Sequence, residues 1–477
     1  MELAKKMADP GVFALGRGQL WPFMGLWTMQ VWIYWANTAS IWQIQSVIPW
    51  WSVLYGAMTL VMLAAAMVHW GMEPARAGGR FDLPLTALMC AVSVSAQARA
   101  WLCPAGAVGV AWGWADAVLG GICMAWGYLR WAAVYARLPI RDAVGCLFAS
   151  YLLGSTLKIL FDVAPAALAS LMAFALPLVS FASVRRALAC DWPHEADRSA
   201  DNLYHAGTLS LLMRLVVCVF VFCLARVSVS MTVTQGGNLL LTRTISHLVE
   251  VAFAAFALWH VFLRNRSLDF PQLWRFVFLF LTTTVLVDCA CREAGVSLGI
   301  GPQLFSGVGT SLLVMLLWLL LADVAHHSSL HPYVVFGVGW SLYVGANCLG
   351  PVALRLLGVS ALTPMVGLVL AYAMGTVMVF CLETRDADVQ RIFADMRKKV
   401  APEEFATIDE RCESLARQFD LTEREVEVMK LLAKGRSKSF IAEELYLSEN
   451  TVRGHAKHLY AKLDIHTKAE LQDLVGA

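Results

Sequence analysis

The stretch LTEREVEVMKLLAKGRSKSFIAEELYLSENTVRGHAKHLYAKLDIHTKAEL (421–471) reads as four short helices separated by tight breaks. Thr422 and Glu425 have the spacing of a capping box at the start of the first helix, and Gly435 is suited to end it. Ser448 is placed to cap the third helix at its N-terminus. This part of the chain is therefore predicted to be a small all-helical domain.

The third predicted helix has two distinct sides. Its apolar residues recur at helical spacing and predict one buried stripe, formed by Val452, Ala456, Leu459 and Leu463. Arg453 and Lys457 are four residues apart and lie beside that stripe. A helix with an apolar back and a basic edge, preceded by a short helix and a turn, has the layout of a helix-turn-helix.

This segment resembles the LuxR-type helix-turn-helix that ends many bacterial transcription regulators. The matching positions are Leu421, Thr422, Arg424, Glu425, Leu431, Leu432, Ala433, Gly435, Ile441, Ala442, Leu445, Ser448, Thr451, Val452, His455, Lys462 and Leu463. The resemblance implies binding of double-stranded promoter DNA. The DNA-binding residues that it implies are Thr451, Val452, Arg453, Gly454, His455, Lys457 and Lys438.

These implied residues divide by role. By position in the family, Arg453, Gly454 and Lys457 face the groove, while Thr451, Val452 and His455 surround them in packing or backbone roles. Two departures from the family pattern, at 438–440 and at Lys468, are expected to alter phosphate contacts. Residues 421–477 carry as many acidic as basic side chains, so binding must rely on a local basic edge, and a dimer would double its contacts.

The remainder of the chain has the composition of a membrane protein. The sequence is 58% hydrophobic and only 15% charged, well below the charged share of about a quarter in soluble domains. A spanning helix needs about 20 mostly apolar residues. Such blocks occur at 21–42, 47–70, 83–101, 105–129, 142–161, 164–184, 208–230, 239–263, 270–291, 303–326, 332–355 and 360–382. The fold class is thus predicted as all-α, with a polytopic bundle of twelve transmembrane helices (6+6) over 1–382.

Basic residues predict the orientation of this bundle. They concentrate in alternate breaks, such as Arg130, Arg137 and Arg141, which places those breaks and both termini in the cytoplasm. The longest charged break, at 185–202, divides six spans from six. This arrangement is similar to the major facilitator architecture, although the Gly-rich loop typical of that family is only faintly matched at 71–82. The expected location is the inner membrane.

Residues 383–420 are charged and are predicted to form a helical cytoplasmic linker. An apolar stripe at steps of three and four runs through Phe405, Ile408, Cys412, Leu415 and Phe419. Two interpretations stay open. The stripe packs on its own domain, or it forms a homodimer seam together with the last helix.

Ionisable and polar side chains inside spans are costly and are therefore candidates for a site. The candidate ligand-binding set is Gln30, Asn37, Asp116, Arg214, Arg243, His247, Glu250, Asp288 and Asn347. Arg243, His247 and Glu250 share one face of a helix, and Glu250 and Asp116 are the preferred members. The alternative is that these groups pair with one another, Arg243 with Asp288 for example, and only fix packing.

These features together predict a one-component regulator. A small-molecule inducer would bind the membrane domain and change how the C-terminal domain meets promoter DNA. The alternative function is a major-facilitator-like transporter with an autoregulatory DNA-binding tail. No enzymatic motif is found, and the scattered cysteines lack the spacing of metal ligands, so no catalytic residue, cofactor or metal is expected.

Overall fold

The computed structural model describes residues 21–38, 50–72, 79–102, 106–190, 239–264, 270–295, 301–328, 330–356 and 421–475, except 464 and 466, with isolated positions between these ranges. The chain divides into two compact units, Met1–Val400 and Ala401–Ala477. Each unit is described by itself below. The described residues form helices, turns and bends with no strand, which confirms the all-α class for them.

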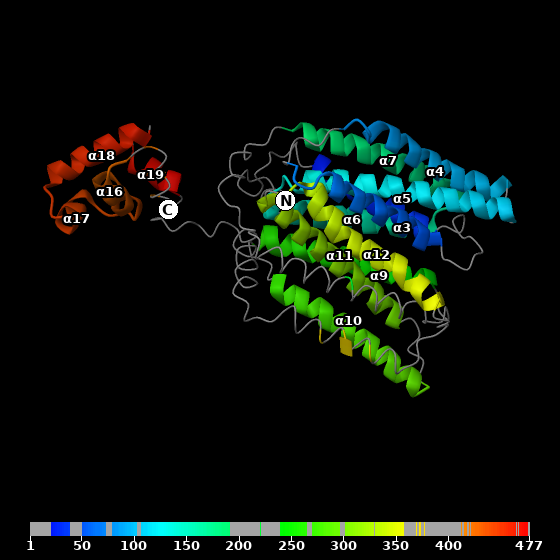
Figure 1. The fold of residues 1–477 in the computed structure, drawn as a ribbon. Helices are drawn as coiled ribbons and strands as arrows, with labels where there is room; N and C mark the ends of the chain where they lie inside the picture. The colour runs from blue at the N-terminus through cyan, green and yellow to red at the C-terminus, as the bar shows by residue number, and fades with distance from the viewer. Residues whose placement is uncertain are drawn as a thin grey trace. The chain divides into compact units, whose positions relative to one another are not determined.

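The first unit is a bundle of long helices (Figure 1). In chain order they are η1 (Trp21–Met24), α2 (Trp27–Thr38), α3 (Trp50–Val68), α4 (Asp82–Leu102), α5 (Ala107–Tyr135), α6 (Ile140–Val163), α7 (Ala166–Ala189), α9 (Leu239–Leu258) continued by a π turn η4 (Trp259–Leu263), α10 (Phe270–Glu293), α11 (Gly301–His327) and α12 (Pro332–Leu356). Each predicted span in the described ranges is therefore helical. The predicted spans at 208–230 and 360–382 lie outside those ranges, apart from isolated positions.

The helices of this unit suit a lipid environment. Among the described residues, 7 helices are long and apolar enough to cross a membrane. Large apolar side chains such as Leu60, Trp101 and Leu171 lie exposed on them, which is favourable when the surrounding solvent is lipid. This unit is therefore a helical membrane domain.

The first six predicted spans (α2 to α7) and the later ones (α9 to α12) meet along two helix pairs, in which α3 packs on α12 and α6 packs on α9. The α3–α12 contact is close because it uses a glycine. A Cβ atom added at Gly337 of α12 would lie 2.7 Å from the Met62 carbonyl oxygen of α3. Small residues at such crossings let helix backbones approach closely, which is how helices gain packing energy within a membrane.

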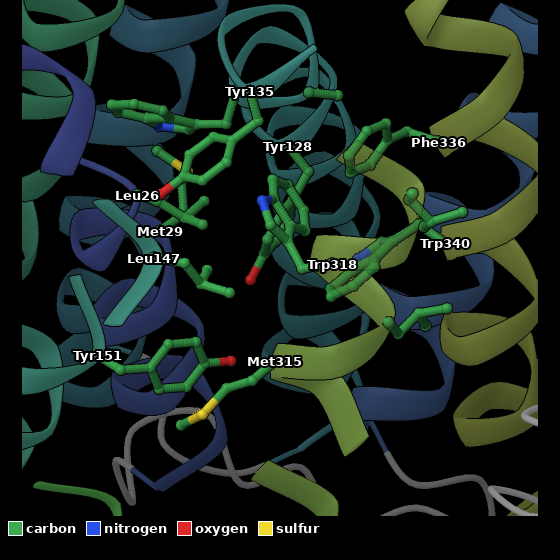
Figure 2. Packing of buried hydrophobic residues seen from close by; sticks show 14 of the residues in the cluster. Leu26, Met29, Tyr128, Tyr135, Leu147, Tyr151, Met315, Trp318, Phe336 and Trp340 are labelled. Carbon is green, nitrogen blue, oxygen red and sulfur yellow. The ribbon is translucent and has the colours of Figure 1, made fainter. Parts of the chain in front are cut away.

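Aromatic side chains from both halves fill the centre of the bundle. Figure 2 shows Tyr128 of α5 close to Trp318 of α11 and Trp340 of α12, with Tyr151 of α6 beside Met315 of α11. The ring centroids of Trp318 and Trp340 are 4.9 Å apart, and Tyr128 lies 5.7 Å from Trp318. The two halves thus share one core.

The second unit is a small four-helix domain formed by α16 (Glu423–Ala433), α17 (Lys438–Glu444), α18 (Glu449–Leu463) and α19 (Lys468–Val475). The predicted stripe of α18 is buried, as Val452, Ala456, Leu459 and Leu463 all lie in the core of the domain. The core is completed by residues of the other helices, among them Val428, Leu432, Ile441 and Leu471.

The apolar stripe predicted in the linker also joins this core where it is described. Cys412 is fully buried there, and Leu415 and Phe419 pack against the same cluster. Phe405 and Ile408 lie outside the described residues. The three described side chains thus follow the interpretation in which the segment packs on its own domain.

Candidate DNA interface and candidate ligand site

Helix α18 is held in place by a buried carboxylate. Thr422 and Glu425 form the predicted capping box, with the Thr422 N–H donating to Glu425 Oε2 over 2.8 Å. The same oxygen accepts a hydrogen bond from Lys462 Nζ of α18 at 2.8 Å. Glu425 therefore caps α16 and anchors α18 at once.

This contact predicts an acid limit to the stability of the domain. Burial raises the pKa of the Glu425 carboxyl, but hydrogen bonds from Lys462 and Thr422 outweigh burial and hold the pKa below its ordinary 4.5. Below pH 4.5 the unfolded chain takes up a proton before the folded one does. The contribution of Glu425 is therefore complete above that pH and is lost as the pH falls through the lower folded value.

The free energy of unfolding of the fragment 401–477, measured in urea, should fall between about pH 5 and 3. We expect Glu425→Gln to make this fall smaller. The matched control is Glu427→Gln, which removes an exposed carboxylate paired with Arg424 at 2.7 Å on the same helix. The same loss of unfolding free energy over this pH range in the two variants would contradict the assignment to Glu425.

The turn before α18 is built from local side-chain contacts. Ser437 caps α17 by accepting the Phe440 N–H at 3.2 Å, and Ser448 caps α18 by accepting the Thr451 N–H at 3.1 Å. Tyr446 lies between the two helices in the left-handed region, at φ 54°, with its side chain 96% exposed. The strained tyrosine makes the sharp bend and stands clear of the domain, where a tyrosine hydroxyl can reach a phosphate.

The predicted DNA-binding residues fall into two groups. Arg453, Lys457 and Thr451 are exposed on α18, and Lys438 is exposed at the start of α17. His455 and Gly454 are half-buried. A Cβ atom added at Gly454 would meet nothing within 4 Å, so no packing within the described domain requires glycine there. A helix pays for such a glycine with about 0.5–1 kcal/mol relative to alanine.

Two residues have roles that the sequence reading did not separate. Val452 is fully buried and serves the core, so it is a packing residue and offers nothing to a base. Lys468, where the family has arginine, donates to the carbonyl oxygens of Gly435 and Arg436 at 2.6 and 2.8 Å. That lysine therefore holds the turn after α16 against the start of α19.

In the membrane unit, Glu250 lies at the centre of a buried polar cluster. Its carboxylate accepts hydrogen bonds from Ser155 at 2.6 Å, from Lys158 at 3.3 Å and from Ser311, while His247 Nδ1 lies 3.2 Å away. Ser155 and Lys158 belong to α6, His247 and Glu250 to α9, and Ser311 to α11. An ion pair buried between the two halves therefore ties them together.

Tyr34 extends this cluster toward α2. Its hydroxyl donates to Asp162 of α6, at 2.6 and 2.7 Å to the two carboxylate oxygens, and its ring meets the His247 ring edge-on at 4.8 Å. Lys158 Nζ lies 5.8 Å from the centre of the Tyr34 ring. The Lys158 ammonium thus lies between the Glu250 carboxylate and the face of the Tyr34 ring.

A cavity of about 160 Å³ opens beside the cluster. It is lined by residues of both halves, namely Gln30, Ile33, Tyr55, Met58, Tyr128, Tyr151, Lys158, Thr310, Ser311, Val314, Trp340, Tyr343 and Val344. Lys158 is the charged member of this lining. The cavity combines an aromatic wall with a few convergent polar groups, which is typical of small-molecule sites.

The predicted ligand-binding residues distribute unevenly around this cavity. Gln30 lines it, and His247 and Glu250 belong to the cluster behind it. Arg243 lies half-buried on α9, one turn from His247. Arg214 and the side chain of Asp288 lie outside the described residues, so the predicted pairing of Arg243 with Asp288 does as well.

Three other candidates do not line the cavity. Asp116 accepts a hydrogen bond from Ser95 at 2.7 Å and has Arg99 Nε 3.9 Å away, all within α4 and α5. Asn37 donates to the Ile33 carbonyl oxygen at 2.8 Å and to Tyr55 at 3.1 Å. Asn347 donates to the Tyr343 carbonyl oxygen. Asp116, a preferred candidate, thus lies away from this cavity, among residues of α4 and α5.

A second buried ion pair lies within the first half and contacts the start of α12. Arg130 of α5 contacts Asp82 of α4 at 2.8 Å and donates to the Tyr333 hydroxyl of α12 at 3.3 Å. Trp126 donates to the other Asp82 oxygen at 3.0 Å. Both of these polar contacts between the halves therefore involve charged groups that are costly to bury without a partner.

The sequence analysis did not select Lys158, the charged residue of the cavity lining. Lys158 is an ionisable residue inside a predicted span, so the rule that selected Glu250 selects it too. Its spacing of four from Asp162 places both on one face of α6. The tyrosines gave no signal, because aromatic residues in spans are ordinary core.

Comparisons with known proteins agree with the C-terminal geometry. Residues 420–475 match the family of bacterial regulatory proteins, luxR family (GerE). The oxygen regulatory protein NreC of Staphylococcus haemolyticus is 45% identical over 51 residues, which cover 11% of this chain and 24% of that protein. The Fimbriae Z protein of Salmonella typhimurium is 43% identical over 53 residues, covering 11% and 25%. The chain thus spans about a quarter of the length of these relatives, and it carries a LuxR-family regulatory domain at its C-terminal end.

Among solved structures, the crystal structure of the human organic anion transporter MFSD10 (TETRAN) is similar at a TM-score of 0.47 and 17% identity. The match covers 75% of this chain and 89% of that one.

Proposed function

We propose that this chain, with its LuxR-family domain joined to a helical membrane domain, is a membrane-bound one-component transcription regulator. A small-molecule inducer binds the membrane domain, and the helix-turn-helix binds promoter DNA. The observation that carries the proposal is the presence, in one chain, of an exposed Arg453–Lys457 edge and of a cavity bordered by an inter-half ion pair.

The DNA-binding step relies on charge at the exposed edge of α18. Arg453 now pairs with Glu449 at 2.9 Å, but both side chains are more than 45% exposed, so this surface pair is worth little and yields readily to a guanine or a phosphate. Lys457 lies one turn further along the same edge. A homodimer on DNA would double these contacts and strengthen binding.

The sensing step relies on the two halves of the membrane domain. A ligand shifts an equilibrium only through different affinities for its states. Because the cavity wall is made by α2, α3, α5 and α6 of one half and α11 and α12 of the other, relative movement of the halves would reshape it. Ligand occupancy would then favour one arrangement. The basic breaks support an inner-membrane location with both termini in the cytoplasm, where DNA is accessible.

A coupled transporter with an autoregulatory tail is the second candidate. Buried ionised residues between helices also mark transport pathways, and the Lys158–Glu250 pair is of that kind. The two candidates differ in one measurable property, which is flux of the inducer across vesicles that contain the protein.

Transcription in the native host tests the proposed function. Glu250→Gln removes the charge-assisted contact with Lys158 that joins the two halves. Such a contact is worth about 1.5–3 kcal/mol, so we expect the inducer concentration that gives half-maximal target expression to shift by about tenfold or more. Basal promoter occupancy, measured by chromatin immunoprecipitation, should stay unchanged. Asp116→Asn is the matched control, because Asp116 is equally buried but lies away from the cavity.

The proposal fails if deletion of the gene alters no transcript. It fails for the site if Glu250→Gln and Asp116→Asn give the same dose curve as the parent strain.

A further inference from the structure

We propose that the cavity beside Lys158 binds a small monocyclic aromatic carboxylate, whose carboxylate group is held by the Lys158 ammonium. This inference rests on the proposed sensing function and specifies the chemical class of its inducer. Three observations carry it, namely the size of the cavity, the donor and acceptor balance at its charged end, and the aromatic wall.

The size of the cavity limits the ligand to about one ring. Its volume is about 160 Å³. An apolar cavity of about 150 Å³ in a protein core accommodates benzene. A single ring with one short substituent therefore fits, and a fused polycyclic compound does not.

The charge at the cavity is set by Lys158 and not by Glu250. Glu250 is 5% exposed and does not line the cavity, and its carboxylate already has Ser155, Lys158, His247 and Ser311 as neighbours. An ammonium group has three N–H donors. Among the described residues, Lys158 makes one hydrogen bond, to Glu250 at 3.3 Å, which is long for a charged pair. The unused donors at this end therefore favour a ligand with a strong acceptor, and a carboxylate is the strongest that a small organic molecule offers.

The aromatic wall suits a planar ring. Tyr55, Tyr128, Tyr151, Tyr343 and Trp340 all line the cavity. Tyr128 and Trp340 are 5.5 Å apart between ring centroids, and Trp340 and Tyr343 are 5.3 Å apart. Aromatic pairs at such distances contribute beyond the area that they bury. A ligand ring can extend this cluster from its open side.

Binding at Lys158 would act directly on the contact between the halves. Lys158 lies on α6, and its partner Glu250 lies on α9. A ligand carboxylate that draws the ammonium toward the cavity weakens its attraction to Glu250. The inducer would thereby loosen the ion pair that ties the two halves.

The test is a panel of four probes of nearly equal size, added to the full-length protein in nanodiscs. The probes are benzoate, benzamide, benzylamine and cyclohexanecarboxylate. Saturation-transfer NMR detects binding of each probe. The dissociation constant is obtained from the rise in the unfolding temperature of the protein with probe concentration. We expect benzoate to bind about tenfold or more tightly than benzamide, since the charge-assisted bond to Lys158 is lost in the amide. Benzylamine should not bind, and cyclohexanecarboxylate should bind about two- to tenfold more weakly than benzoate.

Variants of the lysine complete the test. Lys158→Gln should remove the preference for benzoate over benzamide. Since a single change can disturb the fold, Lys158→Gln/Glu250→Gln is measured beside it, because this pair of changes buries no lone charge. Thr156→Val, at an exposed position on α6, should keep the preference of the parent protein.

Each contrary result has a distinct meaning. Equal binding of benzamide or benzylamine, binding of no probe, or a benzoate preference that survives in the double variant overturns the assignment of an anionic ligand. Equal binding of cyclohexanecarboxylate overturns its aromatic part. Footprinting of promoter DNA with the same nanodiscs separates these failures from failure of the proposed function, because DNA binding does not require any probe.

Discussion

Replacing Arg453 and Lys457 together with alanine should lower promoter-specific affinity by at least about a hundredfold. Each good contact to a base is worth about 1–3 kcal/mol, and every 1.4 kcal/mol is tenfold in affinity. Both side chains are exposed on α18 and contribute nothing to the core of the domain. The fold and the membrane domain should therefore be unaffected. The measurement is footprinting and fluorescence anisotropy on the promoter, repeated at several salt concentrations.

Arg424→Ala is the matched control for this experiment. Arg424 is also an exposed arginine paired with a glutamate on its own helix, at 2.7 Å, but it lies on α16. Its removal should leave promoter footprints in place. A double variant that footprints as the parent protein does, or a control that loses binding equally, would contradict the assignment of α18 as the reading helix.

Breaking the Lys158–Glu250 pair by a single change should destabilise the membrane domain by about 3–5 kcal/mol, because the remaining charge is buried without its partner. The side chains of Lys158 and Glu250 are only 10% and 6% exposed. Lys158→Met leaves the carboxylate, and Glu250→Gln leaves the ammonium. The double variant Lys158→Met/Glu250→Gln buries no charge and keeps an amide acceptor for Ser155 and Ser311, so its loss should be much smaller than the sum of the single losses.

Thermal unfolding of the purified protein in detergent measures these losses. Thr156→Val on α6 is the control, and a surface change of this kind should stay within about 0.5 kcal/mol. If Lys158→Met unfolds at the temperature of the parent protein, the pair does not tie the halves. Additive losses in the double variant would mean that the two charges do not interact.

The order of helices could be predicted with good accuracy because it depends on local properties of the chain. The apolar block at 142–161 became α6 (Ile140–Val163), and that at 332–355 became α12 (Pro332–Leu356). Apolar length decides whether a helix can span a bilayer, and length is visible in sequence. The caps at Thr422, Ser448 and Gly435 were predictable for the same reason.

The composition of the candidate ligand site was only partly predictable. His247 and Glu250 share a helix face, so their proximity follows from spacing alone. Lys158 is 92 residues from Glu250 along the chain, and Ser311 is 61 residues away. Nothing in local spacing indicates that α6, α9 and α11 converge there. Asp116 lies away from the cavity, and its Oδ1 accepts a hydrogen bond from Ser95 of a neighbouring helix, a contact that local spacing does not indicate either.

The sequence alone determined which segments are helices, which of them suit a membrane, and which residues form the exposed edge of α18, since each of these depends on periodicity and composition over a few turns. Only the tertiary structure decided which charges are paired across the bundle, and that Lys158 lines a cavity. Those outcomes depend on contacts between helices that are far apart in the chain. A buried charge there is stabilised by a partner on another helix, and no local sequence pattern indicates which helix that is.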